Sequence, residues 1–367
     1  MSGTNAHLIL EQPPIDPRNP MTQPEARAAL HAPWLLSARE ENALRAQAQR
    51  LRDHMLAQPS TDPADIGYTL ATARPGFTTR AAIFGNNPAE RAQALAALAD
   101  GNAHPALVRG SATTPGRTVF VFPGQGSQWP GMGADLLDTS PVFAEWIDRC
   151  EQALASFVDW SLSEVLRDTD ATLEQADVVQ PALWAVMVSL AETWRARGVE
   201  PDAVIGHSQG EIAAAYLAGI LTLDDAARIV VLRSRIITDH LAGTGTMMSI
   251  ALPAEEVQDR LDTHPEVSVA TLNGPQSTVV AGPRQRLEVL AAELEQHGVQ
   301  VRRIPVDYAS HTPHVDRLRA DLDIALAPIA PQSGRIAFYS TVTGTHLNGT
   351  ELTTDYWFRN LRQPVLF

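Results

Sequence analysis

Apolar runs alternate with helical patterns along most of this 367-residue chain. Short buried strands are predicted at residues 34–36, 80–84, 118–122, 203–206 and 338–342. Helices are predicted at residues 40–58, 66–73, 88–99, 143–155, 162–167, 181–197, 212–216, 223–241 and 313–326. Ser37 is predicted to cap the first helix. Strands that alternate with helices indicate an α/β fold.

The pattern becomes more compact after Gly243-Thr244-Gly245. Strands are predicted at residues 247–251, 267–271, 278–281 and 301–304, and helices at 254–263 and 283–298. This order within a short span suggests a split β-α-β module inserted into a larger domain. The chain then returns to that domain and ends in the segment 356–367.

The region before residue 117 has a different character. A short strand is predicted at Leu8–Leu10, with nothing before it to pair with, which suggests a cut through a longer polypeptide. Residues 33–99 are interpreted as a small α/β unit without a catalytic cluster. The Gly/Ser/Thr/Pro-rich stretch Gly110–Gly116 is predicted to be a linker, and a second domain to start at Arg117.

Composition narrows the class of protein. A hydrophobic share of 44% is ample for a sizeable core, and the length favours two or three domains. The net charge of −14 and the pI of about 5.2 argue against nucleic acid and anionic membrane partners. Cys150 is the single cysteine, which excludes a disulfide scaffold and a cysteine-based zinc site within one chain. No transmembrane-length run or signal pattern is present, so we expect a cytosolic protein.

The chemistry centres on Gly206-His207-Ser208-Gln209-Gly210, a G-x-S-x-G motif. It stands between the predicted strand and the following helix, the context in which such a turn exposes a nucleophilic serine. Glycine is needed at both flanks because a side chain there would clash in the sharp turn. The helix that follows directs its N–H groups toward the same point, as part of an oxyanion hole. The alternative is a glycine-bounded turn whose serine only caps a helix.

A serine nucleophile needs a base, and eleven histidines are candidates. His207 is adjacent in sequence, but neighbours in a sharp turn point apart, so it is predicted to be a wall or a supporting donor. His311 follows the inserted module and can meet Ser208 from a return loop; the alternative is a capping or surface histidine. Arg233 directly follows the apolar run Ile229–Leu232, where burial of its charge is costly unless it meets an anion.

That anion is either the carboxylate of a substrate or one of three acidic side chains. These are Asp224, Asp225 and Asp239.

These motifs resemble the acyltransferase domains of modular type I polyketide synthases and the related malonyl-CoA:carrier-protein transacylases. The resemblance rests on Phe122–Gln128, on Gly206–Glu211 and on the Tyr356–Val365 segment. Ser2–Glu11 is similar to the end of a ketosynthase domain, and residues 33 to about 112 resemble the linker between ketosynthase and acyltransferase.

The resemblance implies an α/β-hydrolase-like large subdomain with an inserted ferredoxin-like small subdomain, preceded by a small α/β linker domain. It implies a ketosynthase tail at 1–20, the linker at 21–116, the large subdomain at 117–243 and 307–367, and the small subdomain at 244–306. Members of the family usually continue with a further helix and strand, so the large subdomain is expected to be truncated at its C-terminal end.

It also implies roles for individual residues. Ser208 would be the acylated nucleophile, His311 its general base and Arg233 the partner of a malonyl-type carboxylate. Gln125 and the backbone N–H of Gln209 would form the oxyanion hole. The remaining pocket residues would be His207, Gln180, Asn273 and Met247. A main-chain carbonyl near Pro364–Phe367, rather than an aspartate, would orient the histidine.

The implied reaction is ping-pong. An acyl-CoA esterifies Ser208, CoA leaves, and the phosphopantetheine thiol of an acyl carrier protein accepts the acyl group. No bound cofactor and no metal are expected, and the partners are the carrier protein, the ketosynthase and the other domains of one megasynthase.

Tyr308-Ala309-Ser310-His311 resembles the motif of methylmalonyl-type members, because the small Ser310 replaces the phenylalanine of malonyl-type ones. One methyl group contributes only about 1–3 kcal/mol in a pocket, so the motif predicts a preference. Two other interpretations stay open. One is a serine esterase with an acidic triad member, and the other is an inactive scaffold piece of the synthase.

Overall fold

The computed structural model describes residues 32–85, 87–112, 116–169 and 174–367. The predicted strand Leu8–Leu10 and the implied ketosynthase tail lie outside these residues. The chain divides into two compact units, Met1–Gly116 and Arg117–Phe367, and each is described by itself.

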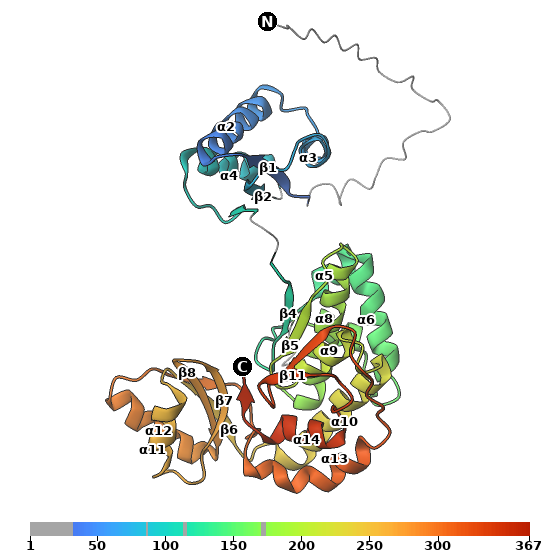
Figure 1. Cartoon of the computed structure of the whole chain (residues 1–367), viewed down its shortest axis with the longest axis vertical. Coiled ribbons are helices and arrows are strands. Elements are labelled where there is room, and N and C mark those ends of the chain that lie inside the picture. The colour runs from blue at the N-terminus through green and yellow to red at the C-terminus, as the bar shows by residue number, and fades with distance from the viewer. Residues whose placement is uncertain (1–31, 86, 113–115, 170–173) are drawn as a thin grey trace, which may run out of the picture. The chain divides into compact units, whose positions relative to one another are not determined.

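Within its described residues, the first unit is a three-stranded antiparallel sheet with three helices (Figure 1). The strands are β1 (Trp34–Ala38), β2 (Thr79–Ile83) and β3 (Leu107–Ser111), in that order across the sheet. The helices are α2 (Glu41–Ala57), α3 (Pro63–Thr72) and α4 (Pro88–Asp100). Fully buried side chains from β1, α2 and α4, among them Trp34, Leu44 and Leu95, form its core.

Two details of this unit differ from the prediction. Glu40, not Ser37, is the N-cap of α2. The Ser37 hydroxyl instead donates to the carbonyl of Pro75 and accepts from the N–H of Phe77, so a tertiary contact replaces the local cap. The linker predicted from Gly110 overlaps β3, because pairing with β2 extends the strand through Gly110 and Ser111.

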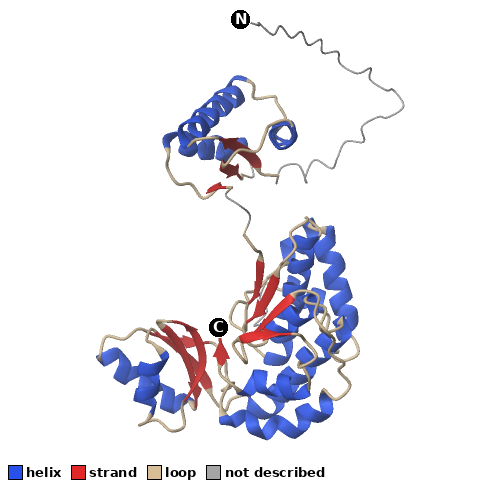
Figure 2. Ribbon diagram, in the orientation of Figure 1, coloured by secondary structure: helices blue, strands red, loops and turns tan. Residues whose placement is uncertain are grey.

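The large subdomain of the second unit contains a four-stranded sheet in the order β11-β10-β5-β4. β4 (Val119–Phe122), β5 (Ala203–Gly206) and β10 (Ala337–Ser340) are parallel, and β11 (Thr345–Leu347) pairs antiparallel with β10. Helices pack around this sheet (Figure 2). They are α5 (Ala134–Thr139), α6 (Pro141–Leu154), α7 (Leu162–Arg167), α8 (Ala176–Arg195), α9 (Gly210–Leu217), α10 (Leu223–Leu241), α13 (Arg319–Ala325) and α14 (Thr354–Arg362).

Two helices differ from the prediction, and the first of them contains a proline. α8 begins at Ala176 rather than at Pro181, which lies inside it. Burial of the helix on nearly all sides from Val179 to Val188 stabilises this turn despite the missing N–H. The helix predicted at 313–326 is a 3₁₀ turn, η1 (Pro313–Leu318), followed by α13. None of the described helices has both the length and the apolar character needed to cross a bilayer.

The small subdomain has the order β-α-β-β-α-β of the ferredoxin-like fold. Its elements are β6 (Thr246–Ile250), α11 (Ala254–Leu261), β7 (Ser268–Gly274), β8 (Ser277–Gly282), α12 (Arg284–Gln296) and β9 (Val301–Ile304). The strands lie in the order β7-β8-β6-β9, all antiparallel. Both helices cover one face of this sheet (Figure 2).

The other face of the small sheet forms a separate apolar cluster that includes Met247, Val279 and Ala309. The strand β12 (Val365–Leu366), which follows α14, pairs parallel with β7 at the edge of this sheet. The last strand of the chain therefore connects the two subdomains, and the segments around 308–311 and 360–367 lie between them.

Candidate active site

The G-x-S-x-G segment forms a tight turn between β5 and α9, as its spacing predicts. Ser208 has a left-handed backbone with φ of 52°. A Cβ at residue 206 would lie 2.1 Å from the backbone N of Glu211, and one at residue 210 would lie 2.3 Å from the carbonyl oxygen of Phe122. Neither position tolerates a side chain, so the two glycines let β5, α9 and β4 approach closely enough to expose Ser208.

Ser208 and His311 meet across 103 residues of sequence, with 3.1 Å between Ser208 Oγ and His311 Nε2. His311 Nδ1 lies 2.8 Å from the carbonyl oxygen of Gln363. Because a carbonyl only accepts, Nδ1 carries the proton and Nε2 is left as the acceptor for the serine hydroxyl. The orienting carbonyl belongs to the residue just before the Pro364–Phe367 segment that the resemblance implied.

The backbone of His311 is also held in an unusual conformation. Its φ is 59°, and among the described residues only Ser208 and His311 are non-glycine residues with positive φ. The His311 N–H donates to the carbonyl of Leu361 at 2.8 Å, which ties this loop to α14. Left-handed backbone in a non-glycine residue costs of order 1–3 kcal/mol and persists only where surrounding contacts enforce it. Both residues of the pair are therefore positioned at an energetic cost.

Burial keeps His311 and His207 uncharged. His311 is 3% exposed, and burial lowers its pKa to about 3, with smaller contributions from His207 and Arg233. Burial also lowers the pKa of His207, whose Nε2 lies 2.8 Å from Asn273 Oδ1. A neutral His311 with a free Nε2 lone pair has the protonation state that a general base requires.

A second polar group joins α8, the loop after β4 and the segment before His311. Gln125 Oε1 accepts from the Tyr308 hydroxyl at 2.8 Å and from Gln180 Nε2 at 3.2 Å. Gln180 Nε2 also donates to the Tyr308 oxygen at 2.9 Å. With its oxygen held in this way, the Nε2 donor of Gln125 is buried and has no partner within the described part of the chain.

Arg233 is 1% exposed and lies on α10. Its Nη1 donates to Asn360 Oδ1 at 2.5 Å and its Nη2 to Gln180 Oε1 at 3.4 Å. Neither partner carries a charge, and Nε is buried without a partner in the described residues. Burial lowers the pKa of Arg233 to about 10, so it remains a cation at neutral pH. An unneutralised buried guanidinium costs free energy unless an anion joins it.

The bonds of Arg233 therefore involve none of the three aspartates left open from the sequence. Asp225, for example, accepts from Thr222 at the start of α10.

All eleven residues singled out from the sequence line one cavity of about 170 Å³ between the large and small subdomains. They are Gln125, Gln180, His207, Ser208, Gln209, Arg233, Met247, Asn273, Tyr308, Ser310 and His311. Val279, Ile304, Val306 and Leu361 supply apolar walls that the sequence did not single out. Ser310 lies against Met247, with 3.4 Å between Oγ and Sδ.

The sequence also missed two polar residues next to the cavity, Glu211 and Asn360. Glu211 is fully buried on α9, and Asn360 on α14 contacts Arg233, Glu211 and the carbonyl of Ser208. A glutamate at the start of a helix that is otherwise apolar was the available signal for the first. Asn360 stands in the Tyr356–Val365 segment that supported the resemblance, but the sequence analysis assigned it no role.

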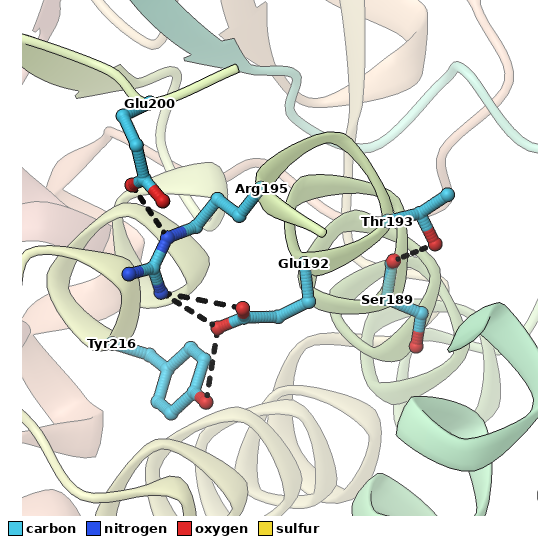
Figure 3. A network of polar contacts seen from close by, with 6 residues as sticks. All are labelled: Ser189, Glu192, Thr193, Arg195, Glu200 and Tyr216. Atoms are coloured by element: carbon cyan, nitrogen blue, oxygen red, sulfur yellow. Dashed lines mark hydrogen bonds and ion pairs between the residues drawn. The ribbon is translucent and has the colours of Figure 1, made fainter. Parts of the chain in front are cut away.

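Larger hollows lie elsewhere, including one of about 410 Å³ next to a cluster on α8 and α9. In that cluster Arg195 bonds to both Glu192 and Glu200, and Tyr216 donates to Glu192 (Figure 3). It holds no serine paired with a histidine. Within the residues that the structure describes, no group of His, Cys, Asp and Glu side chains is arranged to hold a metal ion. Chemistry rather than volume therefore identifies the 170 Å³ cavity as the candidate site.

Two family models match the chain. Residues 119–367 match the acyl transferase domain model, and residues 33–95 match the model named CurL-like, PKS C-terminal. The matches fall on the second and first compact units, respectively.

Comparisons that span all or nearly all of this chain agree. The spectinabilin polyketide synthase system protein NorA' of Streptomyces orinoci is 53% identical over 371 residues, which cover 100% of this chain and 10% of that protein. The acyltransferase domain from module 8 of the salinomycin polyketide synthase matches with a TM-score of 0.87 and 48% identity. The match covers 92% of this chain and 81% of that one. The acyl transferase domain of SpnD in complex with 2-(pent-4-yn-1-yl)malonyl has a TM-score of 0.82 and 30% identity over 92% of this chain and 79% of its own. These likenesses confirm the predicted α/β fold class.

Proposed function

The chain belongs to the acyltransferase domains of modular polyketide synthases, with the preceding linker, and we propose that it loads methylmalonyl units onto an acyl carrier protein. The acyl group would come from methylmalonyl-CoA and pass through an ester on Ser208. The chain spans 10% of the NorA' protein it resembles, so its carrier protein, ketosynthase and other partner domains are part of this proposal.

In the first half-reaction, Ser208 Oγ attacks the thioester carbonyl of the acyl-CoA while His311 Nε2 takes the hydroxyl proton. The 3.1 Å contact and the neutral imidazole support this role. Gln125 Nε2 and the backbone N–H of Gln209 donate to the developing oxyanion. The C–S bond then breaks, and CoA leaves as a thiol with the proton from His311.

In the second half-reaction, the phosphopantetheine thiol of the carrier protein gives its proton to His311 Nε2. Its sulfur attacks the ester carbonyl, the C–O bond breaks, and Ser208 recovers the proton. The carbonyl of Gln363 holds Nδ1–H in both halves, so the imidazole keeps one orientation as its Nε2 proton comes and goes.

The observation that carries the proposal is Arg233, a buried cation in the same cavity as the Ser208–His311 pair. Its two described partners are amide oxygens, which leave the positive charge available to the free carboxylate of a malonyl-type acyl group. Such a carboxylate would orient the acyl unit toward Ser208. A serine esterase for neutral esters gains nothing from this residue, and the orienting group on His311 is a carbonyl rather than a carboxylate.

The size of the cavity supports a short acyl group. Its volume of about 170 Å³ is well below the roughly 300–1,000 Å³ typical of sites for drug-sized ligands. Ser310 and Met247 form one wall, and the small serine leaves room for an α-methyl group. His207 and Asn273 lie at another wall of the same cavity.

The test is intact-mass analysis after incubation with equal concentrations of malonyl-, methylmalonyl- and ethylmalonyl-CoA. We expect one acyl adduct per chain, mainly methylmalonyl, that is absent in Ser208→Ala and is discharged by a phosphopantetheinylated carrier protein. A dominant malonyl adduct would overturn the choice of acyl group and leave the reaction class standing. A folded protein that acquires no adduct would overturn the proposed function.

A further inference from the structure

Behind Arg233 lies a buried carboxylate that does not touch it. Glu211 on α9 is 0% exposed, and Asn360 on α14 stands between the two charges. Asn360 Oδ1 accepts from Arg233 Nη1 at 2.5 Å, and Asn360 Nδ2 donates to Glu211 Oε2 at 2.8 Å. One neutral amide therefore bonds to a guanidinium through its oxygen and to a carboxyl group through its nitrogen.

The remaining contacts hold Glu211 in place. Its Oε1 accepts from the Thr341 N–H at 2.5 Å, and its Oε2 accepts from the Tyr356 hydroxyl at 2.6 Å. The Thr341 hydroxyl lies 2.9 Å from Oε1 as well. Burial raises the pKa of Glu211 to about 7, while these donors favour the ionised form. Both oxygens of Glu211 therefore have hydrogen-bond donors other than Arg233.

Asn360 has a third contact, which ties this layer to the nucleophile. Its Nδ2 also donates to the carbonyl oxygen of Ser208 at 3.1 Å. Shape alone does not require an amide between the two charges, since an aspartate has nearly the same volume. An aspartate would, however, form a charge-assisted, direct pair with Arg233 and present an acceptor to the Ser208 carbonyl. The amide bonds to both groups, so that Arg233 and Glu211 form no direct ion pair.

We infer that Asn360 is a specificity-determining residue that keeps the charge of Arg233 free for acyl groups ending in a carboxylate. This role rests on the proposed function. The preference for acyl groups with a free carboxylate then depends on the absence of a carboxylate at residue 360 as well as on Arg233. Moving the buried carboxyl group from residue 211 to residue 360 therefore abolishes the preference while the site keeps the same number of carboxyl groups.

The experiment compares the wild-type chain with the charge-swapped double variant Glu211→Gln/Asn360→Asp. The rate of Ser208 acylation is measured by intact mass with methylmalonyl-CoA and with propionyl-CoA, which lacks the carboxylate. We expect the wild type to favour methylmalonyl-CoA. In the double variant, the ratio of the acylation rate with methylmalonyl-CoA to that with propionyl-CoA should fall at least about tenfold. A loss of structure alone would slow both substrates, so the ratio separates the charge effect from a structural one.

A matched control for the carboxylate added by Asn360→Asp is Thr353→Asp, which adds a carboxylate at the exposed N-cap of the same helix, α14. It is expected to leave the ratio unchanged. If the double variant does not fold, Asn360→Asp alone carries the same carboxylate and decides the matter. An unchanged ratio in the folded variant would overturn the inference. A wild type that is not acylated at all would instead remove the proposed function on which the inference rests.

Discussion

Two arginines with glutamates nearby show opposite arrangements in this molecule. Arg195, at the end of α8, bonds directly to Glu192 and Glu200 (Figure 3). Arg233, in the cavity, is separated from Glu211 by the amide of Asn360. The first guanidinium is partly exposed and paired with carboxylates, while the second is buried and bonds to amide oxygens.

The contrast teaches which charge is available for function. A direct, solvent-accessible pair contributes about 0–1 kcal/mol and holds α8 and its following turn together. A buried guanidinium bonded to amide oxygens lowers the stability of the empty protein but binds an incoming anion strongly. Four predictions test this division between a structural cluster and a functional cavity, beginning with the backbone of each region.

Gly210→Ala should have the largest effect. The new Cβ would lie 2.3 Å from the carbonyl oxygen of Phe122 and 2.6 Å from that of Pro123, so backbone must move. We expect a loss of more than about 4 kcal/mol in the free energy of unfolding, or failure to fold. Near the structural cluster, Gly198→Ala meets no atom within 4 Å and changes only a residue at φ of 80°, for about 1–2 kcal/mol. Equal losses in urea unfolding would contradict this.

Arg233→Ala should slow acylation by methylmalonyl-CoA about 100-fold, because it removes a buried cation from the proposed carboxylate site. Acylation by propionyl-CoA should change much less. Arg195→Ala should leave both rates within about twofold, since its bonds lie outside the cavity. The measurement is the initial rate of adduct formation by mass spectrometry, and similar losses in both variants would refute the division.

The pH dependence of stability should differ between the two regions. Folding lowers the pKa of His311 from 6.5 to about 3, so the unfolded state binds a proton first as pH falls. This contribution is complete above pH 6.5 and is lost on acidification, at up to about 1.4 kcal/mol per pH unit. His311→Asn should flatten the fall in unfolding free energy below pH 6.5. A slope in His311→Asn identical to that of the wild type would contradict the assignment.

Glu192→Gln should have the smallest effect, with a change below about 1 kcal/mol at pH 7, because Arg195 keeps its bond to Glu200. Burial raises the pKa of Glu192 above 4.5, so the sign is opposite to that of His311. The wild-type carboxyl gains a little stability as pH falls through its folded pKa toward 4.5, and the glutamine variant should lack that gain. Thermal unfolding at several pH values measures the difference.

Local sequence was sufficient where structure depends on near neighbours. The turn at Ser208 follows from glycines at positions 206 and 210, whose missing side chains are required by atoms a few residues away and on β4. The order of strands and helices in the small subdomain was equally readable. Local rules failed where distant contacts compete with them, as when Ser37 bonds to Pro75 and Phe77 instead of capping α2.

The site was only partly predictable. The spacing and burial of Arg233 indicated a need for an anion, but the choice between aspartate partners and a substrate stayed open. The structure shows Asn360 and Gln180 as its partners, from helices that are remote in sequence. The chemistry of Asn360 depends on what lies on either side of it, which no pattern within α14 records.

By itself, the sequence determined most of the elements and the strained turn that presents Ser208, because these follow from residue type and short spacing. Most of the residues that line the cavity were named only through the resemblance to acyltransferase domains. Only the tertiary structure decided that His311 reaches Ser208, that Gln363 orients it, and that an amide separates Arg233 from Glu211. The physical reason is that pairing and protonation depend on distance and burial, which arise when segments 52 to 149 residues apart pack together.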